Sequence, residues 1–348
     1  MSAANEAGGR SGLQLAGAPS DVVPTAAVVA LLAAAALVPF VGSRFLLQLA
    51  TGGLVLGITA MSFSLLAGFG GMLSLAQMAF YGMASYAIAI MTRRYGWPPL
   101  AQIPVALAAA MSLSALFGLI AVRATGVYFL MMTLALSQLF FGVALQWQTF
   151  TGGYNGISGI ARPTVAGFSL QDAVPLYYVA LLGVGCCYLA LRRLLGSPFG
   201  LTLRAIRDNP VRMAALGFRV QTHRWLMIVI SGGFAGIAGI LGTYFHGVVS
   251  PDVAGMTVSI VVVLAALLGG VSSLFGALVG AMIVTILLSV VSFTMQQWFG
   301  TDRYWTVIGA ALAIVVVFLP DGLFGGGDER PRPWRSRRSS TGKRDEAR

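Results

Sequence analysis

The chain has 348 residues, of which 57% are hydrophobic and only 9% are charged, and its mean hydropathy is +0.84. This composition excludes an ordinary soluble globular protein and is typical of a protein that crosses a membrane several times. The net charge of +11 does not indicate nucleic-acid binding, because the basic residues gather in loops and in the C-terminal tail rather than along one face. We therefore expect membrane lipid, and no nucleic acid, as a partner.

Three parts follow from the distribution of apolar residues. Residues 1–21 are rich in Ala, Gly and Ser and contain no apolar block, so we expect a disordered lead rather than a targeting sequence. Residues 22–325 form the transmembrane domain. Residues 326–348 are basic and punctuated by Pro, which predicts a disordered tail that contacts anionic lipid headgroups.

The transmembrane domain is expected to be an all-α bundle with about ten spans. A helix of roughly 20 apolar residues is long enough to cross a bilayer. No charged residue falls in the middle of a run, whereas carriers driven by protons or sodium generally place a charge at membrane depth. The expected spans are residues 22–41, 45–68, 72–91, 100–122, 126–147, 173–195, 225–246, 256–270, 274–293 and 304–319.

The loop charges predict that both termini lie inside the cell. With ten spans and an inner N-terminus, the inner segments hold 17 of the 22 Lys and Arg residues, as the positive-inside rule requires. Arg93 and Arg94 would lie outside and oppose this orientation locally. A half-span at residues 72–91 would move them.

The longest polar interruption, residues 197–224, cannot lie in hydrocarbon and is expected to fold against the membrane surface. Apolar residues alternate with arginines from Phe199 to Arg207 at helical spacing, which predicts an amphipathic helix. A second short helix can begin at Asn209 and Pro210, a cap followed by a first-turn proline, and end at Gly217. We interpret this loop as a surface for a soluble partner, carried by Arg204, Ala205, Arg207, Asp208, Asn209, Ala214, Ala215 and Gly217.

The segment from Gly68 to Tyr86 has too many glycines and polar side chains for an ordinary lipid-facing helix. Gly70 and Gly71 are expected to break the helix, and Ser74 and Gln77 share one face. Because irregular backbone at membrane depth must be covered by protein or must line an aqueous cavity, we interpret these four residues as part of a translocation pathway. The alternative is close helix packing through small residues.

A second glycine-rich stretch, from Thr151 to Pro163, forms an outer loop. It has no Gly-Lys-Ser/Thr sequence, so it does not bind phosphate as a P-loop does. Two interpretations remain open: a mouth that meets a substrate or partner through Asn155 and Gly156, or a simple cluster of turns.

The sequence lacks the residue patterns that metal binding, cofactor binding and catalysis require. The adjacent Cys186 and Cys187 point in different directions on a helix, and His223 and His246 lack partners at ligand spacing. We expect no metal, no cofactor, no catalytic residue and no ATP hydrolysis in this chain. Gly232 and Gly236 have the spacing that lets helices approach closely, either within the chain or against a partner subunit.

Taken together and in order, several segments resemble the M-type permease subunit of branched-chain amino-acid ABC importers. The likeness runs from about residue 45 to 325. It rests on GFGGMLSLAQMAFYGMASY, TGGYNGISGI, SPFGLTLRAIRDNPVRMAALGFRV, SGGFAGIAGILGTYF, SPD, LLGGVSSLFGALVGA and FLPDGLFG.

The resemblance implies uptake across a bacterial cytoplasmic (inner) membrane. It implies a homologous H-type permease, two cytoplasmic ATP-binding subunits, an extracytoplasmic solute-binding protein and a small-molecule substrate. The loop that contacts the ATPase in this family corresponds to Arg204–Gly217. Family members often carry an acidic residue where this chain has Pro210, so one charged contact would be lost. Relatives also serve urea, amides and aromatic acids, so the solute stays open, and the alternative function is a secondary carrier or channel that works alone.

Overall fold

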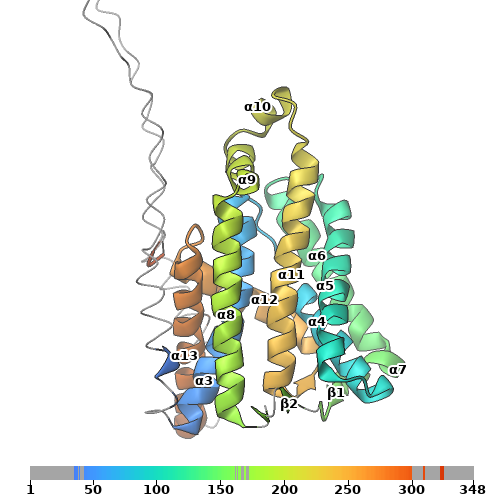
Figure 1. Ribbon diagram of the computed structural model, residues 1–348, viewed down its shortest axis with the longest axis vertical. Helices are drawn as coiled ribbons and strands as arrows, with labels where there is room; N and C mark the ends of the chain where they lie inside the picture. Colours follow the sequence, from blue (N-terminus) through green and yellow to red (C-terminus); the bar gives the residue numbers. More distant parts are fainter. Residues whose placement is uncertain are drawn as a thin grey trace, which may run out of the picture.

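A computed structural model of the chain describes residues 35–37, 39, 43–160, 162, 164–165, 168–169, 172–299, 309 and 322–324. The expected spans at residues 22–41 and 304–319, and both terminal segments, lie outside these parts apart from a few residues. The described residues form a bundle of helices that run roughly along one axis (Figure 1).

Six helices in the described part are long and apolar enough to cross a membrane. This confirms an all-α, multi-spanning architecture. The helices are α3 (Arg44–Ser64), continued by the π-helix η1 (Leu65–Phe69), α5 (Pro99–Ala121), α6 (Val127–Gln146), α8 (Ala173–Gly196), α11 (Val220–His246) and α13 (Leu274–Phe299).

Two expected spans are shorter helices. Residues 70–76 are not helical, because the chain turns at Gly71, where φ is +65°, and α4 therefore begins only at Gln77. It ends at Ile90 and is continued by the π-helix η2 (Met91–Tyr95). Helix α12 covers Met256–Gly269 and has 14 residues, fewer than the roughly 20 that a full span needs. The described part thus holds fewer full-length spans than the apolar runs predicted.

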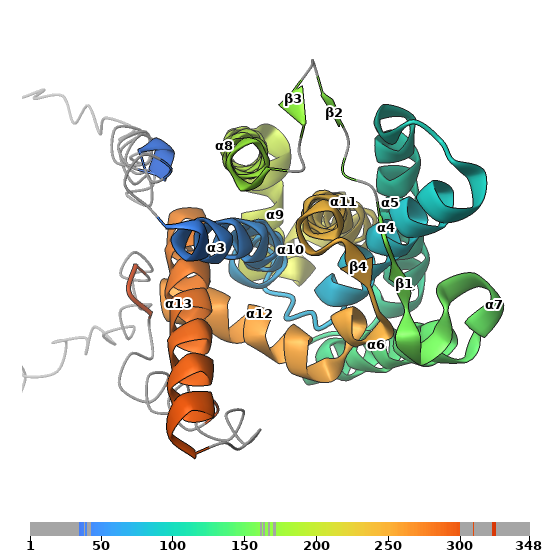
Figure 2. The ribbon, with the colours of Figure 1, turned by 90° about the horizontal axis from the view of Figure 1, so that it is seen from below.

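The connections at one end of the bundle contain short elements. They are α7 (Gln148–Thr151), η3 (Gly153–Asn155), η4 (Pro251–Ala254) and four two-residue strands. Strand β1 (Ile157–Ser158) pairs antiparallel with β4 (Val248–Val249), with Ile157 opposite Val249. Strand β2 (Thr164–Val165) pairs with β3 (Phe168–Ser169). Figure 2, which looks at this end, shows β1 and β4 lying side by side.

Helix α11 is the central helix and contacts α3, α4 and α5 (Figure 2). Its glycines make these contacts close: a Cβ at Gly232 or Gly236 would collide with α5, and one at Gly239 would collide with the backbone of Tyr81 in α4. The spacing of these glycines therefore serves packing within the chain. In the same way Gly53 and Gly57 of α3 lie against α13.

Candidate functional site

The polar interruption forms two short helices at one end of the bundle (Figure 1). Helix α9 covers Pro198–Asp208 and α10 covers Pro210–Ala215. At the start of α9 the Ser197 hydroxyl accepts a hydrogen bond from the backbone N–H of Gly200 at 3.4 Å, and Pro198 occupies the first turn, where no N–H donor is needed. Leu203 and Ile206 are buried. The amphipathic helix expected here is confirmed.

The second helix has the cap and the stop that its sequence predicted. The Asn209 side-chain oxygen accepts a hydrogen bond from Arg212 N at 2.9 Å. At the other end Gly217 has φ +88°, its N–H bonds to Ala214 O at 3.0 Å and the next N–H, of Phe218, bonds to Met213 O at 3.1 Å. This is a Schellman motif, which closes a helix through a left-handed glycine.

The two arginines of α9 reach the bundle. Arg207 donates a hydrogen bond to the carbonyl oxygen of Gly68, and its Cγ lies 3.0 Å from the place that a Cβ of Gly71 would take. The guanidinium of Arg204 lies 5.2 Å from the ring centroid of Phe69, within the distance of a cation–π contact. Both side chains therefore hold α9 to π-helix η1 and to the helix break that follows it.

Helix α10 instead exposes apolar side chains. Val211 is 77% and Leu216 67% exposed, and Ala214 and Ala215 are exposed beside them; Ala205 of α9 is half-buried and Asp208 exposed. Of the eight residues that the sequence grouped, Arg204 and Arg207 contact the bundle, and Ala214, Ala215 and Gly217 are exposed at α10 and its end.

The break between η1 and α4 is partly enclosed by other segments. A Cβ at Gly70 would collide with Met227 of α11, and Ser74 is buried. The freed backbone N–H of Leu75 bonds to Thr133 Oγ1 at 3.2 Å, and that of Met72 to Leu66 O at 2.9 Å. This irregular backbone is therefore partly covered by protein, whereas Gly71 and Leu73 are exposed.

Gln77, at the first position of α4, joins three helices inside the bundle. Its Oε1 accepts a hydrogen bond from Ser62 Oγ of α3 at 3.0 Å, and its Nε2 donates to Ser231 Oγ of α11 at 3.0 Å. Ser231 in turn donates to Ser62 O at 2.7 Å. The Gln77 side chain is 2% exposed. Ser62 and Ser231 were not predicted from the sequence, where each is simply a small polar residue inside an apolar run.

The glycine-rich loop lies at the end opposite α9. Gly156 has φ +66° and its backbone lies against Val249 O, so a Cβ would collide there. Asn155 is exposed. A cavity of about 230 Å³ borders this loop and is lined in part by Gly156, Arg93 and Arg94. The loop residues thus lie far from Gly70, Gly71, Ser74 and Gln77, so the two predicted parts of the pathway do not form one site in this chain.

No group of three His, Cys, Asp or Glu residues within the described part could hold a metal ion. Cys186 is exposed and Cys187 buried, and both are free.

A bundle of several apolar helices long enough to cross a membrane, with a helical hairpin at one end, is the architecture of a multi-spanning membrane protein. The chain belongs to the family described as branched-chain amino acid transport system / permease component, whose model matches residues 45–317. It is a permease subunit of an ABC importer.

Relatives of both permease types are similar to this chain. It is 28% identical over 319 residues to the high-affinity branched-chain amino acid transport system permease protein LivM of Escherichia coli, covering 85% of this chain and 74% of LivM. It is 27% identical over 260 residues to the probable branched-chain amino acid transport permease protein LivH of Methanocaldococcus jannaschii, covering 70% and 78% of the two chains. No solved structure matches the chain.

Proposed function

We propose that this chain forms half of the translocation pathway for branched-chain amino acids or a related small polar solute. The names of the related permeases support this solute class. A homologous H-type permease would form the other half, a solute-binding protein would deliver the solute from outside, and two cytoplasmic subunits would hydrolyse ATP. The similarity to both LivM and LivH supports a pair of related permeases.

The ends of the bundle differ in charge, which supports an orientation. Among the described residues, Arg44, Arg93, Arg94 and Arg162 belong to the end with β1, whereas eight arginines belong to the end with α9: Arg123, Arg192, Arg193, Arg204, Arg207, Arg212, Arg219 and Arg224. Positive charge favours the cytoplasmic side. We therefore assign the α9 end to the cytoplasm, which agrees with inner N- and C-termini in a bacterial inner membrane.

The single observation that carries the proposal is the hairpin of α9 and α10. Helix α9 is tied to the bundle through Arg204 and Arg207, while Val211 of α10 and Leu216, the residue after it, are exposed. Exposed apolar side chains that lie together on a surface helix are typical of a protein contact surface. We assign α10 to the ATPase contact and α9 to the transfer of its motion into the bundle.

The proposed pathway residues lie next to the element that α9 contacts. Segment 70–77 directly follows η1, the element that α9 contacts, and it contains the non-helical residues that precede α4. In the conformation described here Ser74 and Gln77 are buried. We propose that Gly70, Gly71, Ser74 and Gln77 border the pathway and move when α9 moves, and that Asn155 and Gly156 belong to its outer mouth.

A carrier or channel that works alone is the alternative. No Asp, Glu, Lys or Arg lies near the middle of the six described spans, and the α9–α10 hairpin has no use in such a protein. Reconstituted vesicles distinguish the two. We expect uptake of labelled leucine to require the ATPase subunits and ATP, and uptake that follows a proton gradient without them would favour the carrier.

The docking assignment has a matched control. Val211 on α10 and Val127 at the start of α6 both lie at the α9 end and are 77% and 66% exposed. We expect Val211→Asp to reduce copurification of the ATPase subunits by about tenfold or more, because a charge would be buried in an apolar contact. Val127→Asp should leave copurification unchanged. Equal losses in both variants would remove the docking assignment from α10.

A further inference from the structure

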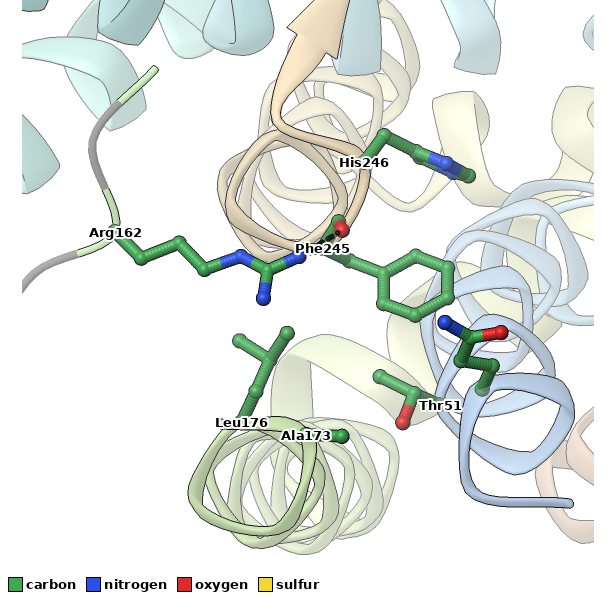
Figure 3. A pocket seen from close by; sticks show the side chains of 7 residues that line it. Thr51, Arg162, Ala173, Leu176, Phe245 and His246 are labelled. Carbon is green, nitrogen blue, oxygen red and sulfur yellow. Dashed lines mark hydrogen bonds between the residues drawn. The ribbon is translucent and has the colours of Figure 1, made fainter. Parts of the chain in front are cut away.

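A cavity of about 460 Å³ opens at the end of the bundle opposite α9. The first turns of α3 and α8 and the last turn of α11 surround it (Figure 3). Its volume falls within the range of about 300–1,000 Å³ that small-molecule sites occupy. The described residues that line it are Gln48, Thr51, Arg162, Ala173, Leu176, Phe245 and His246.

The walls of this cavity combine two chemistries. Arg162 supplies a positive charge, and the amide of Gln48 and the hydroxyl of Thr51 supply neutral polar groups. Leu176, which is buried, and the ring of Phe245 supply an apolar surface. None of the seven lining residues is acidic. Such walls suit a small molecule with a carboxylate at one end and an aliphatic group at the other.

The guanidinium of Arg162 is held at the edge of this cavity. Its Nε donates to Tyr244 O at 2.9 Å and one terminal nitrogen donates to Phe245 O at 3.0 Å. These carbonyls belong to the last turn of α11, where carbonyl groups lack helical partners and a cation is favoured. The bonds fix the orientation of the planar group, so little ordering is needed when an anion binds.

We propose that this cavity is a solute-binding vestibule in which Arg162 attracts the carboxylate of an aliphatic amino acid while Leu176 and Phe245 contact its side chain. The proposal rests on the proposed function, in which this end faces outward. It narrows the solute class, since urea and simple amides carry no carboxylate. A carboxylate from an acidic side chain of the solute-binding protein would be the other source of the same chemistry. The volume of about 460 Å³ and the apolar wall favour the free solute.

Thiol labelling tests the vestibule without relying on transport. Ala173→Cys is introduced after Cys186→Ala and Cys187→Ala, in the assembled transporter in membrane vesicles without binding protein. We expect an anionic methanethiosulfonate to react faster than a cationic one, and Arg162→Gln to reduce that ratio by about tenfold, because one nearby charge is lost. Arg44→Gln, at the same end but outside the cavity, should leave the ratio unchanged.

Protection by solutes tests the ligand class. Millimolar leucine, isoleucine or valine should slow the labelling, whereas leucinamide, which lacks the carboxylate, should not. Three results would each overturn the proposal: equal protection by leucine and leucinamide, no protection by leucine, isoleucine or valine, or a thiol at position 173 that does not react.

Measurements of uptake and of binding-protein affinity show whether Arg162 binds the free solute or the solute-binding protein. They also separate a failure of the vestibule from a failure of the proposed function. Arg162→Gln should lower ATP-dependent leucine uptake by about tenfold or more, while the solute-binding protein binds the transporter as tightly as before. An equal loss of that binding would assign Arg162 to the binding protein and overturn the vestibule. Wild-type uptake that does not need ATP would instead contradict the proposed function, whatever the labelling result.

Discussion

Arg207 of α9 donates a hydrogen bond to the backbone carbonyl oxygen of Gly68 in π-helix η1. Gly68 also lies against the backbone of Val271, in the turn between α12 and α13, with no room for a side chain. From Gly68 the chain continues through the break at Gly71 to Gln77, which bonds to α3 and α11. We propose that a displacement of α9 moves η1 and, through the segment that follows it, the start of α4. π-helical turns of this kind often occur at functional sites.

The contact of Arg207 gives the first prediction. We expect Arg207→Ala to lower ATP-dependent uptake by about tenfold or more, because a charge-assisted hydrogen bond between α9 and η1 is lost. ATP hydrolysis by the assembled complex should continue, since α10 and its exposed surface are unchanged. The measurement is uptake per ATP hydrolysed in proteoliposomes.

Two variants control this result. Arg207→Lys keeps the charge and a donor, and we expect partial uptake. Arg123→Ala removes an exposed arginine at the same end of the bundle, outside the α9–α10 hairpin, and uptake should not change. If Arg207→Ala transported as many solute molecules per ATP as the wild type, the link between α9 and η1 would have no role in coupling.

The hydrogen bonds of Gln77 give a second prediction, on stability. Gln77→Leu should lower the free energy of unfolding by about 1 to 3 kcal/mol, because the buried hydroxyls of Ser62 and Ser231 each lose a partner. The midpoint of thermal unfolding in detergent measures this change. Gln146→Leu, at the exposed end of α6, is the matched control and should shift the midpoint little. Similar shifts in both variants would contradict a structural role for the Gln77 bonds.

The ends of α10 were predictable from sequence because the signals are local. Asn209 followed by Pro210 specifies a helix start within two residues, and Gly217 specifies the stop through its left-handed backbone. The helix break at Gly70 and Gly71 was predicted correctly. The start of α4 was nevertheless predicted about five residues too early, because residues 72–76 are mostly apolar and yet are not helical.

Which way side chains point required the tertiary structure. Arg204 and Arg207 alternate with buried Leu203 and Ile206 on α9, and the sequence placed both arginines on an outward surface. On a helix, neighbouring residues are only about 100° apart, so a long arginine beside a buried position reaches the bundle edge. The partners of Gln77 lie 15 and 154 positions away, and no periodicity within one segment connects them.

Glycine contacts give a third prediction with a control in the same fold. A Cβ at Gly239 of α11 would overlap the backbone of Tyr81, whereas one at Gly142 of α6 meets nothing within 4 Å. We expect Gly239→Ala to lower the free energy of unfolding by about 1 to 3 kcal/mol through overpacking. Gly142→Ala should be neutral or stabilising by about 0.5 to 1 kcal/mol, because alanine restricts the unfolded chain. Thermal unfolding of both variants measures these changes. A Gly239→Ala variant as stable as the wild type would mean that α4 and α11 can move apart at no cost in free energy.

The cap of α10 gives the last prediction. Asn209→Ala removes the acceptor for Arg212 N and should destabilise this six-residue helix by about 1 kcal/mol. Such a short helix has few other interactions, so we expect faster amide hydrogen exchange at residues 211–216 and weaker copurification of the ATPase subunits, with the thermal midpoint of the whole chain unchanged. Asn209→Asp keeps an acceptor and should behave like the wild type. Slow exchange in Asn209→Ala, together with normal copurification, would show that Pro210 and the Gly217 stop suffice to hold α10, and that the asparagine cap does not contribute to the docking surface.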